Sequence, residues 1–233
     1  MTSGVHEIGG SRGRVLRAFW DSSVGKKAVM AVTGLIGIAF VIGHMVGNLQ
    51  VFQGAERLNA YGALLHGPLN ELLWVVRVVL IAAVVLHVTA AWQLTRRDRA
   101  ARPVDYRSRA PQVSTLASRT MRWGGVLLLV FIVVHILHFT TGTIRPAGAF
   151  TPGDVYANVT GSFRIWWVTL FYVVAMAALG LHLYHGAWSS VRTLGAERPA
   201  KNLRSRPVAV VVAVVVAAGF AAVPVAVALG WVK

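Results

Sequence analysis

Five long apolar runs constrain the fold of this chain more than any other feature of its sequence. They occupy about 28–49, 70–94, 122–141, 165–188 and 208–230. Each run has roughly 20 residues, which is enough to cross a ~30 Å hydrocarbon core as an α-helix. Backbone groups find no water inside a bilayer, so runs of this length favour helices that satisfy their own hydrogen bonds. The sequence predicts an all-α integral membrane bundle of five transmembrane helices.

The composition supports a membrane protein and argues against a nucleic-acid-binding one. Hydrophobic residues make up 56% of the 233 residues, charged residues make up 13%, and the mean hydropathy is +0.62. The net charge is +15, but the basic residues cluster between the apolar runs. We therefore predict a basic N-terminal segment, residues 1–27, followed by one transmembrane domain, residues 28–230. The first run lacks a convincing small-residue cleavage site, so we expect it to be retained.

The basic residues also predict an orientation. Most of the 23 lysines and arginines lie in residues 1–27, 95–122 and 189–207, which are alternate connections between the runs. Basic loops are typical of the cytoplasmic side of a membrane. The N-terminus is therefore expected in the cytoplasm and the C-terminus outside.

Histidines lie in four of the five runs, at two depths. His44 and His135 lie about 20 Å or more from the cytoplasmic ends of their runs, which places them toward the outer face. His87 and His182 lie about 25 Å from the outer ends of their runs, which places them toward the inner face. The sequence thus predicts two layers, each with one histidine from each of two helices.

Paired imidazoles inside a membrane indicate a metal or haem site. A six-coordinate b-type haem needs one axial nitrogen above the iron and one below, within an apolar surround. The chain has no cysteine, so it cannot supply thiolates or attach haem through thioethers. The alternative for any one histidine is a hydrogen bond between helices.

A second histidine follows three residues after His135 and after His182. Residues i and i+3 share a helix face, so His138 and His185 are possible additional metal ligands. A Rieske-type iron–sulfur cluster would use two such histidines, with its thiolates supplied by another subunit. The alternative for His138 is an amphipathic ring that reaches the outer headgroups, and for His185 the same at the inner ones.

Four stretches resemble a known family. They are "SVGKKAVMAVTGLIGIAFVIGHMVGNLQVF", "VVLHVTAAWQL", "LLVFIVVHILHFT" and "GLHLYHGAWSSVRTLG". Together they are similar to the single-chain, five-helix cytochrome b membrane anchor of succinate dehydrogenase and fumarate reductase, respiratory complex II, over about residues 22–195. The resemblance implies up to two b-type haems, an outer one and an inner one. It assigns their ligands as the pairs His44 with His135 and His87 with His182.

The resemblance also implies a function in the tricarboxylic acid cycle and the respiratory chain. The chain would anchor a flavoprotein subunit, which carries FAD and oxidises succinate, and an iron–sulfur subunit at a bacterial cytoplasmic membrane. Electrons would pass from the iron–sulfur subunit to quinone. Members of the family differ in haem number, so an anchor without its own cofactor stays open.

Further candidate residues surround these layers. Quinone reduction needs hydrogen-bond donors and a proton route; an inner quinone site would use Trp20, Ser23, Lys27 or His185, with Glu71 and Arg77 near an outer alternative. Arg77 is also a possible partner for a haem propionate, or it pairs with Glu71 or reaches the interface.

Two other classes of function compete with a complex II anchor. A di-haem cytochrome b anchor of another respiratory dehydrogenase also uses membrane histidines, but residues 23–48 argue against it. A proton transporter could relay protons through them, yet such proteins usually contain inverted repeats, which this sequence does not clearly show.

Overall fold

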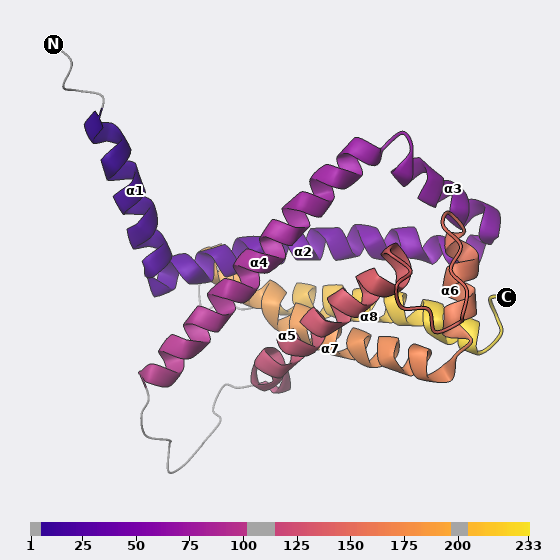
Figure 1. Cartoon of the computed structure of the whole chain (residues 1–233). Coiled ribbons are helices and arrows are strands. Elements are labelled where there is room, and N and C mark those ends of the chain that lie inside the picture. Colours follow the sequence, from indigo (N-terminus) through magenta and orange to yellow (C-terminus); the bar gives the residue numbers. More distant parts are fainter. Residues whose placement is uncertain (1–5, 102–114, 197–204) are drawn as a thin grey trace.

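The computed structural model describes residues 6–101, 115–196 and 205–233, and over these residues the chain is helical without a strand (Figure 1). Within the described ranges, five helices are long and apolar enough to cross a membrane. They are α2 (Ser23–Asn48), α4 (Asn70–Ala100), α5 (Leu116–His135) with its π-helical extension η2 (Ile136–Thr140), α7 (Trp166–Thr193) and α8 (Ser205–Ala228). The prediction of an all-α bundle with five membrane helices is confirmed.

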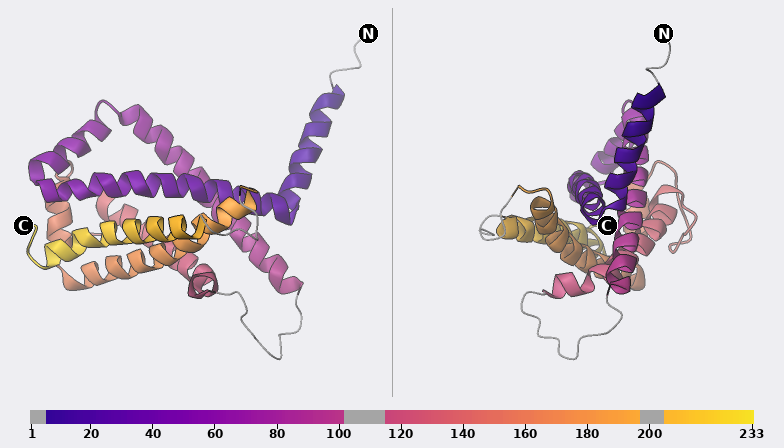
Figure 2. Two further views of the ribbon diagram at one scale, coloured as in Figure 1. Left: turned by 180° about the vertical axis from the view of Figure 1, so that it is seen from behind. Right: turned by 90° about the vertical axis from the view of Figure 1, so that its left-hand side faces the viewer.

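The five long helices do not pack equally. Helices α7 and α8 lie side by side, α2 packs against α7 and α4, and α5 packs against α7 (Figures 1 and 2). Helix α4 buries only Ala83, Ala90 and Leu94, all in its second half. Its first half leans away from α2, as Figure 1 shows. Helix α4 is therefore packed against the bundle through its second half only.

The chain direction places the basic segments at one end. The same end of the bundle has the start of α2, the end of α4, the start of α5, the end of α7 and the start of α8, each farther left in Figure 1 than the other end of its helix. We call this the inner end and the opposite end the outer end, after the orientation expected from the charges. The assignment of the inner end to the cytoplasm stays a prediction.

A short helix precedes the bundle at the inner end. Helix α1 (His6–Asp21) turns sharply away from α2 (Figure 1). Ser22 separates them and caps α2, because its hydroxyl accepts a hydrogen bond of 2.8 Å from the Gly25 N–H. Lys26 is only 1% exposed, and its ammonium group donates to the carbonyl of Trp20 and lies 4.6 Å from the centroid of that indole ring. This lysine fastens α1 to α2.

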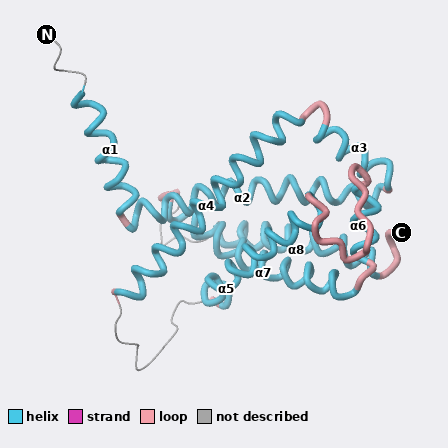
Figure 3. Tube along the Cα trace, viewed as in Figure 1, coloured by secondary structure: helices cyan, strands magenta, loops and turns pink. Residues whose placement is uncertain are grey.

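Three short helices cover the outer end: η1 (Leu49–Gln53), α3 (Ala55–His66) and α6 (Val155–Phe163). Figure 3 shows the loop of residues 141–154 at the same end. Asn59 joins α3 to α6, since its amide donates to Asp154 at 3.0 Å and its oxygen accepts from the Tyr156 N–H at 2.9 Å. The Asp154 carboxylate caps α6 through the Ala157 N–H. That N–H and then the Asn59 amide hold the pKa of Asp154 below its ordinary value.

Two buried apolar clusters hold the helices together. The first joins the outer end, where Val51, Phe163, Tyr172 and Val227 are buried. The second lies between α2, α7 and α8. At this second contact a Cβ on Gly180 would approach the Ala217 Cβ at 3.1 Å. Small residues thus let the helix backbones approach closely, as membrane helices require.

Candidate functional site

Two pairs of histidines face each other inside the bundle. The ring centroids of His44 and His135 lie 5.8 Å apart, with the rings at 79° to each other. Those of His87 and His182 lie 6.3 Å apart, at 53°. The structure therefore brings together α2 with α5 near the outer end and α4 with α7 nearer the inner end, in the combinations expected from depth. Their role as ligands stays a prediction.

The separation within each pair fits one metal ion held between two imidazoles. A metal–imidazole bond is about 2 Å long, so two opposed nitrogens lie about 4 Å apart and the ring centroids about 6 Å apart. Both pairs lie near this separation. Over the described residues no group of three or more metal-binding side chains gathers around one point. Each pair offers two imidazoles, which is the number of axial ligands that a six-coordinate haem takes.

The inner pair has one nitrogen fixed by a hydrogen bond. His87 Nδ1 lies 3.0 Å from the Thr33 hydroxyl oxygen. That hydroxyl donates its own hydrogen to the Val29 carbonyl at 2.7 Å, so its oxygen accepts from His87 Nδ1–H. His87 then presents an unprotonated Nε2. His182 differs, because its Nδ1 is buried and has no hydrogen-bond partner in the described part of the chain.

Glycines flank both rings of the inner pair. A Cβ on Gly34 would lie 3.5 Å from Cε1 of His87, and a Cβ on Gly125 would lie 3.8 Å from Cε1 of His182. The backbone of α2 and of α5 therefore approaches each imidazole edge without a side chain between them. A flat ligand beside these rings would meet backbone at these two points.

Aromatic rings enclose the outer pair. His44 stacks on Phe40 at 5.3 Å and lies 5.7 Å from Phe220 on α8. His135 stacks on Phe131 at 5.6 Å. The Asn48 amide nitrogen lies 3.3 Å from both ring nitrogens of His44, so it sits over the ring face rather than on either lone pair. The outer pair has an apolar wall that excludes water.

His138 is buried and has both ring nitrogens engaged. It is 4% exposed, with Nδ1 3.0 Å from the Tyr172 hydroxyl and Nε2 2.9 Å from the Ser162 hydroxyl. The expectation that its ring reaches the outer headgroups is therefore wrong. The π-helical turn η2 causes the difference, since the Thr141 N–H bonds to the Ile136 carbonyl five residues earlier. A ring on this widened turn points into the bundle.

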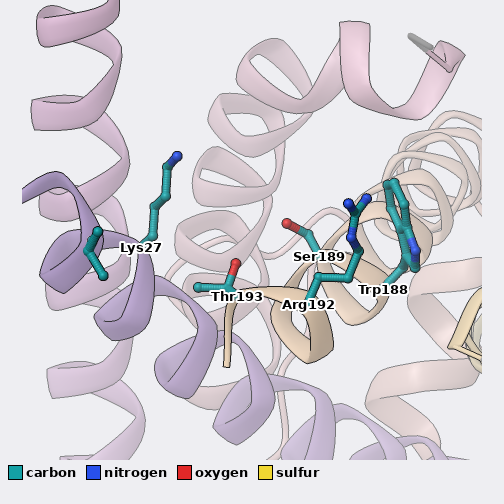
Figure 4. Close-up of a pocket in the computed structure, with 6 residues that line it drawn as sticks. Lys27, Trp188, Ser189, Arg192 and Thr193 are labelled. Atoms are coloured by element: carbon teal, nitrogen blue, oxygen red, sulfur yellow. The ribbon is translucent and has the colours of Figure 1, made fainter. Parts of the chain in front are cut away.

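His185 lies beside a pocket at the inner end. Its Nδ1 is buried without a partner in the described residues, and so is Nε1 of Trp188, whose ring centroid lies 6.0 Å away. The pocket has a volume of about 390 Å³ and lies between α2 and α7. Figure 4 shows Lys27 on one side, and on the other the hydroxyls of Ser189 and Thr193. The residues that line it are Val24, Lys27, Trp188, Ser189, Arg192 and Thr193.

The predicted quinone residues are only partly gathered there. Lys27 lines the pocket, whereas Trp20 is bound by Lys26 and Ser23 begins α2. The four pocket residues of α7 are not among the candidates expected from the sequence. The signal that could have found them is the polar end of that apolar run, "WSSVRT", which faces Lys27 near the start of α2.

Arg77 lies on the first half of α4, which leans away from the bundle. Its guanidinium lies 4.9 Å from the centroid of the Trp74 ring, and it forms no ion pair with Glu71. The pairing with Glu71 expected as one alternative is not formed. A role for Arg77 at a haem propionate stays a prediction.

The described residues form a bundle of membrane-length helices in which two histidine pairs face each other. The family model of the succinate dehydrogenase/fumarate reductase transmembrane subunit matches residues 95–221, more than half of the chain. The chain belongs to this family. No curated protein and no solved structure matches it. The matched region contains His135 and His182, whereas His44 and His87 lie before it.

Proposed function

We propose that this chain anchors a flavoprotein and an iron–sulfur subunit at a bacterial cytoplasmic membrane and carries electrons from the iron–sulfur subunit to membrane quinone. The two facing histidine pairs carry this proposal, because a purely mechanical anchor does not need imidazoles opposed at metal-binding separation. Family membership supports the anchor role and a place in a complex of the succinate dehydrogenase type.

His44 with His135 and His87 with His182 are the proposed ligands of an outer and an inner b-type haem. Each haem, when bound, supplies one-electron redox chemistry. The chain's own residues set its surroundings: Thr33 fixes the ring of His87, and Phe40, Phe131 and Phe220 keep water from the outer pair. Thr33 and His44 are separated by about 16 Å along α2, so both sites lie within one membrane thickness.

The pocket between α2 and α7 is the proposed site of quinone reduction. Trp188, which lines the pocket, has a buried Nε1 without a partner in the described residues, and the neighbouring His185 has the same at Nδ1, which supports a polar ligand at this end. Lys27, Ser189 and Thr193 add donors for quinone carbonyls, and cations near the carbonyls stabilise developing negative charge. The alternative is a site near Glu71 and Arg77 at the outer end, where α4 leaves the bundle.

Basic side chains at the inner end support docking of the two partner subunits there. Arg14, Arg17, Lys27 and Arg192 belong to α1, α2 and α7, which meet at this end. Arg122 also lies at this end, where its guanidinium forms an ion pair with the Asp98 carboxylate at 3.3 Å. The positive electrostatic potential of these basic side chains attracts acidic surfaces of partner subunits.

The haem assignment is tested with the purified complex. We expect a b-type band in the reduced-minus-oxidised spectrum and two haems per chain, together with succinate:quinone activity. His182→Ala removes one haem, and His66→Ala, outside the pairs, removes none. Activity without any b-type band would instead leave a cofactor-free anchor or a Rieske-type cluster with partner thiolates, which iron and sulfide analysis distinguishes.

The quinone site is tested separately. Ser189→Ala combined with Arg192→Gln raises KM for quinone several-fold while electron transfer from succinate to an artificial dye acceptor stays unchanged. Arg164→Gln, an exposed arginine at the opposite end of α7, is the matched control. An unchanged quinone KM in the double variant would move the site to the outer alternative.

A further inference from the structure

A continuous line of polar contacts leads from His135 to Ser162. The Tyr172 hydroxyl lies 3.5 Å from His135 Nδ1 and 3.0 Å from His138 Nδ1. His138 Nε2 in turn lies 2.9 Å from the Ser162 hydroxyl. Tyr172, His138 and Ser162 are 6%, 4% and 5% exposed. Three buried polar side chains and the half-buried His135 thus form one network.

The donors and acceptors of this network fix a direction. The Tyr172 hydroxyl has one hydrogen and lies between two Nδ1 atoms, so it donates to one and accepts from the other. Hydrogen bonds from O–H donors are shorter than those from N–H donors. The shorter contact therefore has Tyr172 donating to His138 Nδ1. His135 Nδ1–H then donates to the Tyr172 oxygen, and His138 Nε2–H donates to Ser162.

We propose that His138 and Tyr172 are positioning residues for His135. They hold its ring as the Nδ1–H tautomer, so that the bare Nε2 is the atom offered to a metal between His135 and His44. This inference rests on the proposed function for the presence of a metal, but the tautomer itself is a property of the chain. Hydrogen bonds to the outer nitrogen of a ligating histidine orient the ring and change its basicity.

The two histidines of "HILH" thereby have different tasks. In a regular α-helix, residues i and i+3 share a face. Here both histidines contact Tyr172 of α7, but His138 also reaches Ser162 of α6, while His135 faces His44. The inner pair has no such relay, since Nδ1 of His182 is unpartnered in the described residues. The network should therefore affect one redox centre only.

Two measurements test the proposal. In the purified complex, potentiometric titration of the b-type bands should show a rise in one of two midpoint potentials for Tyr172→Phe and for His138→Leu. His138→Gln should restore the wild-type value, because its amide accepts from Tyr172 and donates to Ser162. Tyr184→Phe, on the same helix but packed in the second apolar cluster, should shift neither midpoint.

The second measurement needs no haem. In the ¹⁵N-histidine-labelled full chain in lipid bilayers, solid-state NMR should show His135 protonated at Nδ1, and Tyr172→Phe should convert it to a mixture of tautomers. If the wild-type complex lacks any b-type band, the haem assignment fails and this spectrum alone decides the network. The proposal would be overturned if Tyr172→Phe left the His135 signal unchanged. It would also be overturned if this variant shifted both midpoint potentials or neither of them.

Discussion

The outer and inner histidine pairs have similar ring separations and different surroundings. The outer pair is enclosed by Phe40, Phe131 and Phe220 and is backed by a buried hydrogen-bond network. The inner pair is flanked by glycine backbone, and His87 has hydrogen-bonding contacts with the Thr33 hydroxyl and the Met30 backbone. Two sites built from the same ligand type can thus differ in rigidity and in the electron density of their imidazoles, which is what a directed transfer between them needs.

The largest expected effect is the loss of one centre at a time. His44→Ala and His135→Ala should each remove the same haem, and the double variant should remove no more than either alone, because one ligand cannot hold the site. The haem content per chain, measured by pyridine haemochrome, should fall from two to one. A double variant that lost both haems would break the assignment of independent pairs.

The next largest effect is expected from glycine-to-leucine substitutions that crowd one histidine pair and leave the other unchanged. A leucine at Gly34 would press on His87, and one at Gly219 would meet the Met45 side chain beside His44. Overpacking of a close contact costs about 1–3 kcal/mol. Gly34→Leu should therefore weaken retention of the inner haem and Gly219→Leu that of the outer one, as measured by haem release on heating.

Gly37→Leu is the matched control for both variants, since nothing lies within 4 Å of a Cβ at Gly37. It should release neither haem early. If Gly34→Leu and Gly219→Leu destabilise both centres equally, the two pairs respond as one packing unit and the comparison fails.

A smaller effect is expected from the hydrogen bond of the inner pair. Thr33→Val removes one hydrogen-bond acceptor of His87 and leaves the Met30 backbone, so the imidazole would donate somewhat less electron density to a bound iron. A hydrogen bond contributes about 1 kcal/mol, so we expect an upward shift of a few tens of millivolts in the inner midpoint potential. The outer midpoint should not move. A shift of the outer midpoint alone would reverse the assignment of the two bands.

The smallest effect concerns the cap of α6, the helix that carries Ser162. The pKa of Asp154 is lowered in the folded chain, so its carboxylate stabilises the fold above the ordinary pKa, and this stabilisation is lost as the pH falls through the lowered value. Asp154→Asn should thus lower the Tm slightly at pH 7 and not at strongly acidic pH. A difference in Tm that persists in acid would mean that the charge is not responsible.

The sequence predicted the spans and the pairing of histidines because both follow from simple periodicities. Apolar length sets the spans, and the fixed rise of a helix sets the depths of His44, His87, His135 and His182. The length of a span and the depth of a histidine each depend on one helix alone, so they can be predicted without knowing how the helices pack.

The rest depends on contacts between distant segments. The partners of His138 are 24 and 34 residues away, and the widened turn that directs it there has no periodic signature. Helices α1, α3 and α6 lack an apolar run of membrane length. The sequence does not single out Lys26, because a basic residue before an apolar run is typical of a headgroup contact. In the structure its ammonium group instead binds the Trp20 carbonyl at the end of α1.

The π turn at Ile136–Thr140 also affects how related chains should be aligned. It contains one residue more than a regular α-helical turn, and each residue of an α-helix turns the chain by about 100°. A relative without this turn would need a one-residue deletion inside an otherwise continuous hydrophobic span. In an alignment made without a gap from the start of the helix, its residue facing Tyr172 would then be the one aligned with Leu137, which precedes His138. The histidine spacing in this helix is therefore a readable marker of whether the network is present.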